Sequence, residues 1–246
     1  MHPWIPALLV GVLFLLVASV AEPPSQARGN EGADEQAHRE QSARNLRKLG
    51  IAMHHYQNEQ KALPQASSED ARGKALLSWR VAILPYLEEK KLYDEFRRDE
   101  PWDSEHNQKL LDKMPAFFAA PGVKTKEKHL TYYQVFVGPD TPFAPAQRRT
   151  LREWTMGDGT SNTVMLVEAG EAVPWTRPAD LSHEMDKELP KLGGMFKHGF
   201  HACFGDCSIY FIKRQIPERL MHQLIGWNDG RNEDTADFLE RIRIEE

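Results

Sequence analysis

Two cysteines carry the most nucleophilic side chains of the sequence. Cys203 and Cys207 are its only cysteines, and they flank residues 204–206. If residues 205–206 form a tight hairpin turn, the two sulfurs lie near each other across it, so a small disulfide is one interpretation. The direct cross-strand partner of Cys203 in such a hairpin would be Ser208, which favours two buried or half-buried thiols instead. The sequence leaves both interpretations open.

Two histidines close to these cysteines add a third interpretation, a metal site. His198, His201, Cys203 and Cys207 would supply imidazole and thiolate, the ligands that zinc prefers. Residues 201 and 203 would share one face of a strand. Because the spacing matches no standard zinc pattern, we expect neither a bound metal nor a cofactor.

Acidic and aromatic side chains suggest a different chemistry, the binding of a sugar or of calcium. Asp99 and Glu100 precede Trp102 and Asp103, which would place carboxylates beside an aromatic surface. The alternative is a capped, solvated loop in which Trp102 is a packing anchor. The residues that could contact a ligand or form an interface are Trp102, Asp103, Asp158, Trp175 and Asp206.

Further along the chain, the same kinds of residue have simpler interpretations. Asp158 begins a run of oxygen-bearing side chains, but an Asp-Gly pair before a β-rich run is first a turn signal. Trp175 is expected to anchor an extended loop. Glu168 ends an apolar strand and is expected to pair with a base such as Arg80 or Arg177.

Motifs of the common catalytic machineries are absent from the sequence. It contains no nucleophile elbow, P-loop, dinucleotide fingerprint, His-Glu-x-x-His or Cys-x-x-Cys pattern, so we expect a protein that is not an enzyme. The 31 Lys and Arg residues against 36 Asp and Glu residues give a net charge of −5, which excludes a basic nucleic-acid binder.

The N-terminus indicates export. Residues 5–20 are a nearly unbroken apolar run without charge, and the small residues Ser19 and Ala21 suit signal peptidase. Residues 1–21 are therefore predicted to be a signal peptide or, if uncleaved, a single membrane anchor. The rest of the chain would be secreted, periplasmic or at the cell surface. Residues 22–35, rich in Pro, Gly and acidic residues, are predicted to be a flexible linker.

The elements that must position these side chains divide into a helical half and a β-rich half. Apolar residues at three- and four-residue steps predict an amphipathic helix over residues 34–60, and further helices over residues 75–96 and 104–114. β-Branched and aromatic runs predict strands at residues 131–137, 163–168, 201–204 and 207–212. Helices first and strands later indicate one α+β domain, residues 36–246, with a mainly antiparallel sheet.

Several separate motifs in this order resemble a large bacterial family, domain of unknown function 1559. They are residues 45–56 (NLRKLGIAMHHY), 77–81 (LSWRV), 84–88, 99–107, 157–163 (GDGTSNT), 173–181 and 193–206. The resemblance implies a pilin-like fold, in which a long N-terminal helix packs on an antiparallel sheet with a helical insertion between them. Members often carry a prepilin leader and a C-terminal motif written H-X9-DG. The family brings no established catalytic activity, and an older label connects it with extracellular solute binding.

The sequence departs from this family pattern near its C-terminus and at two cysteine positions. Phe196 stands where the H-X9-DG motif has His, and Cys207 stands where it has Gly, so only Asp206 is kept. Ser42, or a neighbour, and Ala120 stand where members often have cysteines. The loss of both is what the resemblance would imply if those two cysteines form a disulfide.

These features together predict an exported, pilin-like cell-envelope protein with a non-catalytic structural or interaction role and protein partners in the envelope. It would be uncoupled from pilus assembly, because the apolar run lacks a prepilin cleavage site and prolines at residues 23–24 would interrupt the helix. The alternative is an extracellular binding protein for a carbohydrate or other small solute, using Trp102 and Trp175. A hydrolase with two carboxylates has the least support. A concave aromatic pocket would favour binding, and a flat exposed apolar patch would favour a protein interface.

Overall fold

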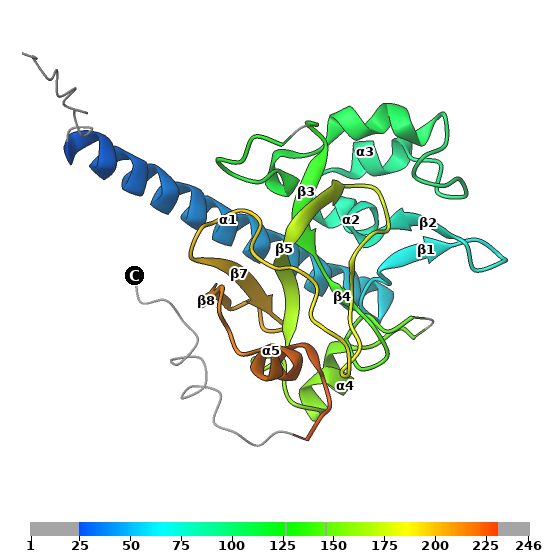
Figure 1. The fold of residues 1–246 in the computed structure, drawn as a ribbon. Helices are drawn as coiled ribbons and strands as arrows, with labels where there is room; N and C mark the ends of the chain where they lie inside the picture. The colour runs from blue at the N-terminus through cyan, green and yellow to red at the C-terminus, as the bar shows by residue number, and fades with distance from the viewer. Residues whose placement is uncertain (1–24, 126, 146, 231–246) are drawn as a thin grey trace, which may run out of the picture.

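A long helix begins the part of the chain that the computed structural model describes, residues 25–125, 127–145 and 147–230. This helix, α1 (Ser25–Gln60), extends well beyond the body of the molecule in Figure 1. Residues 32–34 are exposed, whereas Leu46, Leu49 and Met53 are fully buried. α1 therefore packs against the body from about His38 and Arg39 onward, where Arg39 lies over the Phe211 ring at 3.7 Å and His38 lies beside Gly122.

The start of α1 differs from the prediction of a flexible linker over residues 22–35. The structure places residues 25–35 in the helix. Their sequence includes Ala, Gln, Arg and Glu, which favour helix, and the two glycines, Gly29 and Gly32, cost only about 1 kcal/mol each. The interruption expected between the N-terminus and Ala43 is thus absent from residue 25 onward. The prolines at 23–24, the predicted signal peptide or anchor at 1–21 and its apolar run at 5–20 lie outside the described residues.

Between α1 and the main sheet, an insertion of short elements covers one end of the helix. β1 (Ser67–Glu69) and β2 (Ala75–Ser78) pair antiparallel. Short helical segments follow, namely α2 (Trp79–Ala82), η1 (Leu84–Leu87), α3 (Lys90–Glu95), η2 (Asn107–Lys113) and η3 (Ala116–Phe118). The predicted helical insertion is confirmed in outline, but it consists of single turns rather than two long helices.

Two bounds within the insertion were wrong for identifiable reasons. Residues 75–78 are strand, and the helix begins only after Ser78. Ser78 has an extended backbone, and its side chain accepts a hydrogen bond from the Arg80 amide, which caps the helix. The helix predicted over residues 104–114 is a 3-10 helix from Asn107, with Ser104 Oγ accepting a hydrogen bond from the Asn107 amide at 3.1 Å. Local capping was readable from the sequence, whereas strand pairing was not.

A four-stranded antiparallel sheet forms the second half, in the order β3-β5-β7-β8. Its strands are β3 (Leu130–Gln134), β5 (Val164–Pro174), β7 (Gly199–Phe204) and β8 (Ile209–Lys213). A short parallel pair, β4 (Phe136–Val137) and β6 (Leu181–Ser182), lies outside this sheet. The predicted α+β class, with a long N-terminal helix packed on an antiparallel sheet, is confirmed.

The two faces of the sheet bury different groups, as the two-residue period of a strand requires. On β7, Phe200, Ala202 and Phe204 pack in a cluster with α5 (Glu218–Ile225). His201 and Cys203 alternate with them and face α1, since His201 shares a carboxylate with a serine of α1 and Cys203 approaches Gly50. α5 and α4 (Leu151–Met156) were not predicted, although Thr150 and Glu153 form a capping box at the start of α4.

In the described part of the chain, no helix combines the length and the apolar character needed to cross a membrane.

Candidate functional site

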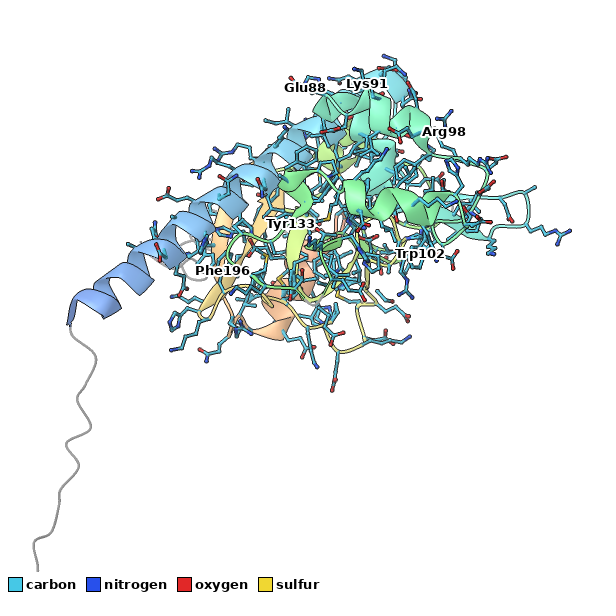
Figure 2. The ribbon with its side chains drawn as sticks, turned by 90° about the horizontal axis from the view of Figure 1, so that it is seen from above. Glu88, Lys91, Arg98, Trp102, Tyr133 and Phe196 are labelled. Carbon is cyan, nitrogen blue, oxygen red and sulfur yellow. The ribbon has the colours of Figure 1, made fainter. Side chains whose placement is uncertain are left out.

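A groove of about 630 Å³ lies where the end of α1 meets β1, β2, α2, η1 and α3. We call it the aromatic groove, because Tyr56, Trp79, Tyr86 and Tyr93 line it. The exposed Arg98, labelled in Figure 2, also lines it. The groove is therefore built from three segments that are separate in the sequence.

The aromatic rings of the groove hold fixed relative positions. Tyr56 and Tyr86 meet edge to face, with centroids 5.7 Å apart. The Arg98 guanidinium carbon lies 4.6 Å from the centre of the Tyr93 ring. Burial raises the pKa of Tyr56 and of Tyr86 above the ordinary value, so both keep their phenolic protons.

Polar groups share the groove with these rings. Its lining includes Gln60, Gln65, Ser67 and Ser68, which offer neutral donors and acceptors. Lys90 is exposed and pairs with Asp94 at 2.9 Å, so its charge is partly compensated. Aromatic faces beside hydroxyl and amide groups suit a ligand with apolar C–H faces and many hydroxyl groups.

Beneath the groove, a buried ion pair fixes Trp79. Arg80 is fully buried and donates to Asp180 Oδ1 at 2.8 Å, to the Tyr133 carbonyl at 2.7 and 2.9 Å, and to Ser78 Oγ at 2.7 Å. Asp180 Oδ1 also accepts the Trp79 indole N–H at 3.1 Å. Burial lowers the pKa of Arg80, and the Asp180 carboxylate opposes that effect. The pair holds α2 against the sheet and sets the indole in the groove wall.

A second buried polar cluster joins α1 to the sheet. Glu168 accepts a hydrogen bond from Ser42 Oγ, and it bonds His201 through the ring Nδ1 at 2.9 Å and the backbone amide at 2.7 Å. Tyr133 OH lies 2.8 Å from Ser42 Oγ and accepts from Asn45 at 3.3 Å. Figure 2 shows Tyr133 in the interior of the molecule. These groups are buried and mutually bonded, so this cluster is a structural link between helix and sheet.

This cluster corrects the expected partner of Glu168. We expected an arginine, Arg80 or Arg177, but Arg80 bonds Asp180 and Arg177 lies over the Trp102 ring at 5.5 Å. The error arose because Glu168 faces α1, where histidine and serine satisfy its oxygens.

The two cysteines meet at the surface of α1. Both are free thiols, Cys203 buried and Cys207 half-buried. The cross-strand partner of Cys203 is Ile209, not Ser208 as expected, because the turn is longer and the Phe204 amide bonds the Ser208 carbonyl at 2.9 Å. The interpretation as buried and half-buried thiols is the one that the structure adopts.

A histidine pair lies on the other side of the sheet, beside a hollow of about 640 Å³ at α5 that is lined mainly by exposed charged residues. His183 Nε2 lies 2.9 Å from His222 Nδ1. Burial, and then the nearby His222, lower the pKa of His183 to about 4. His183 Nδ1 is buried and has no partner among the described residues, so a proton there would have no acceptor.

The five residues predicted to contact a ligand do not come together. Trp175 is fully buried, stacks on Phe118 at 5.5 Å and donates to the Leu111 carbonyl at 3.0 Å, as the anchor interpretation expected. Trp102 is half-buried and, as Figure 2 shows, lies apart from Arg98. Asp103 next to it is exposed.

The remaining two candidates hold turns. Asp158 accepts the amides of residues 229 and 230 at 2.8 and 3.1 Å, and so ties the strand entry to the C-terminal segment. Asp206 accepts from the amide and hydroxyl of Ser208 at 2.9 and 2.6 Å. Both fit the turn interpretation.

The proposed metal ligands are also separated. His198 is exposed, His201 bonds Glu168, and the two cysteines lie beside Gly50. Among the described residues no group of three or more His, Cys, Asp or Glu side chains is placed to hold a metal ion.

The sequence reasoning missed the residues of the aromatic groove and one partner of the thiols. The sequence places three of these residues, Tyr56, Tyr86 and Tyr93, in helical patterns, where an aromatic residue is first interpreted as part of the core. His54 was not singled out from the sequence, although it lies beside the turn that carries Cys207. Its signal was the four-residue step from Gly50, which places both on one helix face.

Helix, sheet and insertion define an α+β protein with a long N-terminal helix laid across an antiparallel sheet. The family model described as Protein of unknown function (DUF1559) matches residues 32–195. The chain therefore belongs to the DUF1559 family. The match ends before Phe196, so the segment corresponding to the H-X9-DG motif lies beyond it. No curated protein and no solved structure matches the chain.

Proposed function

We propose that this chain is an exported, non-catalytic cell-envelope protein that binds a carbohydrate chain in the aromatic groove. The observation that carries the proposal is the groove itself, with three partly exposed tyrosines beside neutral hydroxyl and amide groups and the fully buried Trp79 beneath them. Export is supported by the charge-free apolar residues 5–20. The absence of common catalytic motifs from the sequence supports a binding role.

The exposed surface favours a groove over a flat protein interface. In the described part of the chain, the exposed large apolar side chains are Ile51, Met156 and Met185. They belong to α1, to α4 and to the segment between β6 and β7, so they form no continuous patch. Because the exposed apolar side chains are scattered, we favour ligand binding over the structural or interaction role expected from the sequence.

The test is a calorimetric titration of the full mature chain with soluble envelope oligosaccharides. Tyr86→Ala removes a ring from the groove, and we expect the affinity to fall about 2- to 10-fold, since an aromatic contact contributes about 0.5–1.5 kcal/mol. Tyr86→Phe keeps the ring and separates stacking from hydrogen bonding. Trp102→Ala is the matched control, because Trp102 lies outside the residues that line the groove.

Two results would contradict the proposal. One is the absence of binding to every oligosaccharide tested by a chain that is folded by circular dichroism. The other is an affinity that falls for Trp102→Ala but not for Tyr86→Ala, which would move the site to the loop singled out in the sequence. Export itself is checked by sequencing the N-terminus of protein recovered from the envelope, where cleavage after Ala21 is expected.

A protein partner remains the second candidate, favoured by the projecting first half of α1 in Figure 1. This helix would hold the body away from an anchor, or present its exposed face to another envelope protein. Crosslinking in intact cells from a cysteine placed at exposed Asp34 tests it. A specific protein adduct is expected, and a crosslinking pattern identical to that of the unmodified chain would contradict it.

A further inference from the structure

The two thiols share one point of contact on α1. Gly50 faces the sheet, and a Cβ at this position would lie 2.9 Å from Cys203 Sγ and 3.2 Å from Cys207 Sγ. The sulfurs are therefore no more than about 6 Å apart, and Cys203 Sγ donates to the Phe204 carbonyl at 3.5 Å. The absence of a side chain at Gly50 leaves the room that both sulfurs occupy.

The backbone at Cys207 is in an unusual conformation. Its φ of 66° lies in the left-handed region, which disfavours a residue with a Cβ and which glycine adopts freely. Hydrogen bonds fix the turn, because the Cys207 amide bonds the Phe204 carbonyl at 2.9 Å and the Gly205 amide bonds the Thr163 carbonyl at 3.0 Å. A strained residue held by such a turn motivates a functional hypothesis, here alongside the packing of Cys207 against the core.

A histidine completes the group. His54 lies one turn beyond Gly50 on α1, with Nε2 2.8 Å from the carbonyl of Gly205 in the turn that carries Cys207. The interaction with Cys207 raises the pKa of His54 against the effect of burial.

The environment makes the two thiols unequal. Hydrogen bonds from Cys203 and His54, together with the charge of His54, lower the pKa of Cys207 to about 5 against the effects of burial and of Asp206. The hydrogen bond to Cys207, and then burial, raise the pKa of Cys203, while Arg47 acts in the opposite direction. The half-buried sulfur of Cys207 is thus the more acidic of the two, and the buried sulfur of Cys203 is the less acidic.

We propose that Cys207 and Cys203 form a redox-active thiol pair whose substrate is a disulfide, with Cys207 as the attacking sulfur, Cys203 as the resolving sulfur and His54 as the positioning residue. This site is independent of the aromatic groove and does not rest on the proposed carbohydrate ligand. It also differs from a permanent structural disulfide, because the pair cycles between thiol and disulfide.

The reaction balances with a disulfide RSSR as the oxidant. The Cys207 thiolate attacks one sulfur, forms a mixed disulfide with R and releases one RS⁻. Cys203 then attacks Cys207 Sγ and loses its proton, and the second RS⁻ departs and takes up that proton as RSH. The Cys203–Cys207 disulfide forms, and two electrons pass from the protein to RSSR.

The experiment uses the full mature chain, reduced and freed of reductant, with the aromatic disulfide dithiobis-nitrobenzoate as the probe. The unmodified chain is expected to release two equivalents of nitrothiolate and to end two hydrogens lighter by mass spectrometry. Cys203→Ser is expected to release one equivalent and to keep a stable mixed disulfide. Cys207→Ser is expected to react slowly, because only the buried sulfur remains.

The pH dependence of the rate separates a reactive pair from two ordinary thiols. A thiol with an ordinary pKa of about 8.5 would react about 80-fold more slowly at about pH 6 than at about pH 8, whereas we expect a change below about twofold. His54→Gln is expected to shift the profile toward that of an ordinary thiol while the circular dichroism spectrum stays unchanged. An 80-fold fall in the unmodified chain, or a mixed disulfide that persists on it, would overturn the proposal.

Discussion

Removal of the Asp180 carboxylate is the sharpest test of how the fold positions the groove. Asp180→Ala leaves Arg80, whose side chain is completely buried, with no opposing charge. It also removes the acceptor of the Trp79 indole N–H and of the Val135 amide, which lie 3.1 Å from Asp180 Oδ1. Every one of these donors is inside the protein, where water replaces the lost oxygen only in part.

The expected cost follows from these contacts. Breaking a buried ion pair by removing one partner costs about 3–5 kcal/mol. Two further donors without acceptors cost about 1–3 kcal/mol each, although such losses overlap when they share one oxygen. We expect Asp180→Ala to lower the free energy of unfolding by about 4–6 kcal/mol, a large part of the about 5–15 kcal/mol typical of a domain.

Urea unfolding followed by tryptophan fluorescence measures this loss, because Trp79 donates to the same carboxylate. With a slope of about 2–3 kcal/mol per molar urea, the midpoint should fall by roughly 2 M. Asp180→Asn is the matched control: it keeps one acceptor oxygen, loses the charge and puts an NH2 group in place of Oδ2, which is buried without a partner among the described residues, so we expect about half the effect.

The double variant Arg80→Met with Asp180→Leu refines the test. Because it removes both charges, it should be less destabilised than the sum of the two single variants. A loss below about 1 kcal/mol for Asp180→Ala, or strict additivity in the double variant, would refute the reasoning that Arg80 depends on Asp180.

Two further predictions concern buried titratable groups. Glu168→Leu removes the acceptor of the Ser42 hydroxyl and of two His201 donors, so urea unfolding should show a loss of about 3–6 kcal/mol, and a loss near zero would exclude the cluster as the link between α1 and the sheet. Burial and His222 lower the pKa of His183 to about 4 in the folded chain. In the unfolded chain the same histidine binds a proton near pH 6.5, so between these two pH values only the unfolded chain is protonated at this residue. Stability should therefore fall as the pH drops from about 6.5 to about 4, by about 1–2 kcal/mol after solvent screening. His183→Phe should remove this slope in unfolding midpoints measured at about pH 7 and about pH 5, and an unchanged slope would assign it to other groups.

Much of the framework was predictable because its signals are local. Alternation along β7 separates Phe200, Ala202 and Phe204 from His201 and Cys203, and the structure places these two sets on opposite faces. Three- and four-residue steps gave the buried half of α1 in the same way. Such patterns depend only on neighbours along the chain, so they can be recognised in the sequence without knowing the tertiary fold.

The aromatic groove and its support could not be predicted, because they depend on pairings between distant segments. Residues 75–78 read as the start of a helix, and only their pairing with β1 makes them a strand. Arg80 and Asp180 are separated by 100 positions, and no periodicity connects them. Trp175 was expected to contact a ligand, but it is fully buried, as is Trp79 beneath the groove.

The family motifs acquire a physical meaning once these pairings are known. Arg80 and Asp180 come from two of the segments on which the resemblance to the DUF1559 family rests, and they meet in the buried ion pair. Asn107, from a third segment, donates to the carbonyls of residues 97, 100 and 101 at 3.0–3.2 Å and so closes the loop before η2. These shared residues hold the framework, which explains why motifs of this kind suggested no catalytic chemistry.

Two of the departures from the family pattern, Phe196 and Cys207, lie on either side of β7. Phe196, in the place of the motif histidine, packs on the rings of His201 and Phe211 at 5.7 and 6.1 Å, so an apolar contact occupies that position. Cys207, in the place of glycine, keeps a left-handed backbone that glycine would adopt without strain. Packing therefore explains the first departure. The second replaces glycine in a left-handed turn by a side chain that packs on the core beside Cys203, so the backbone strain there accompanies the thiol pair to which we assign disulfide exchange.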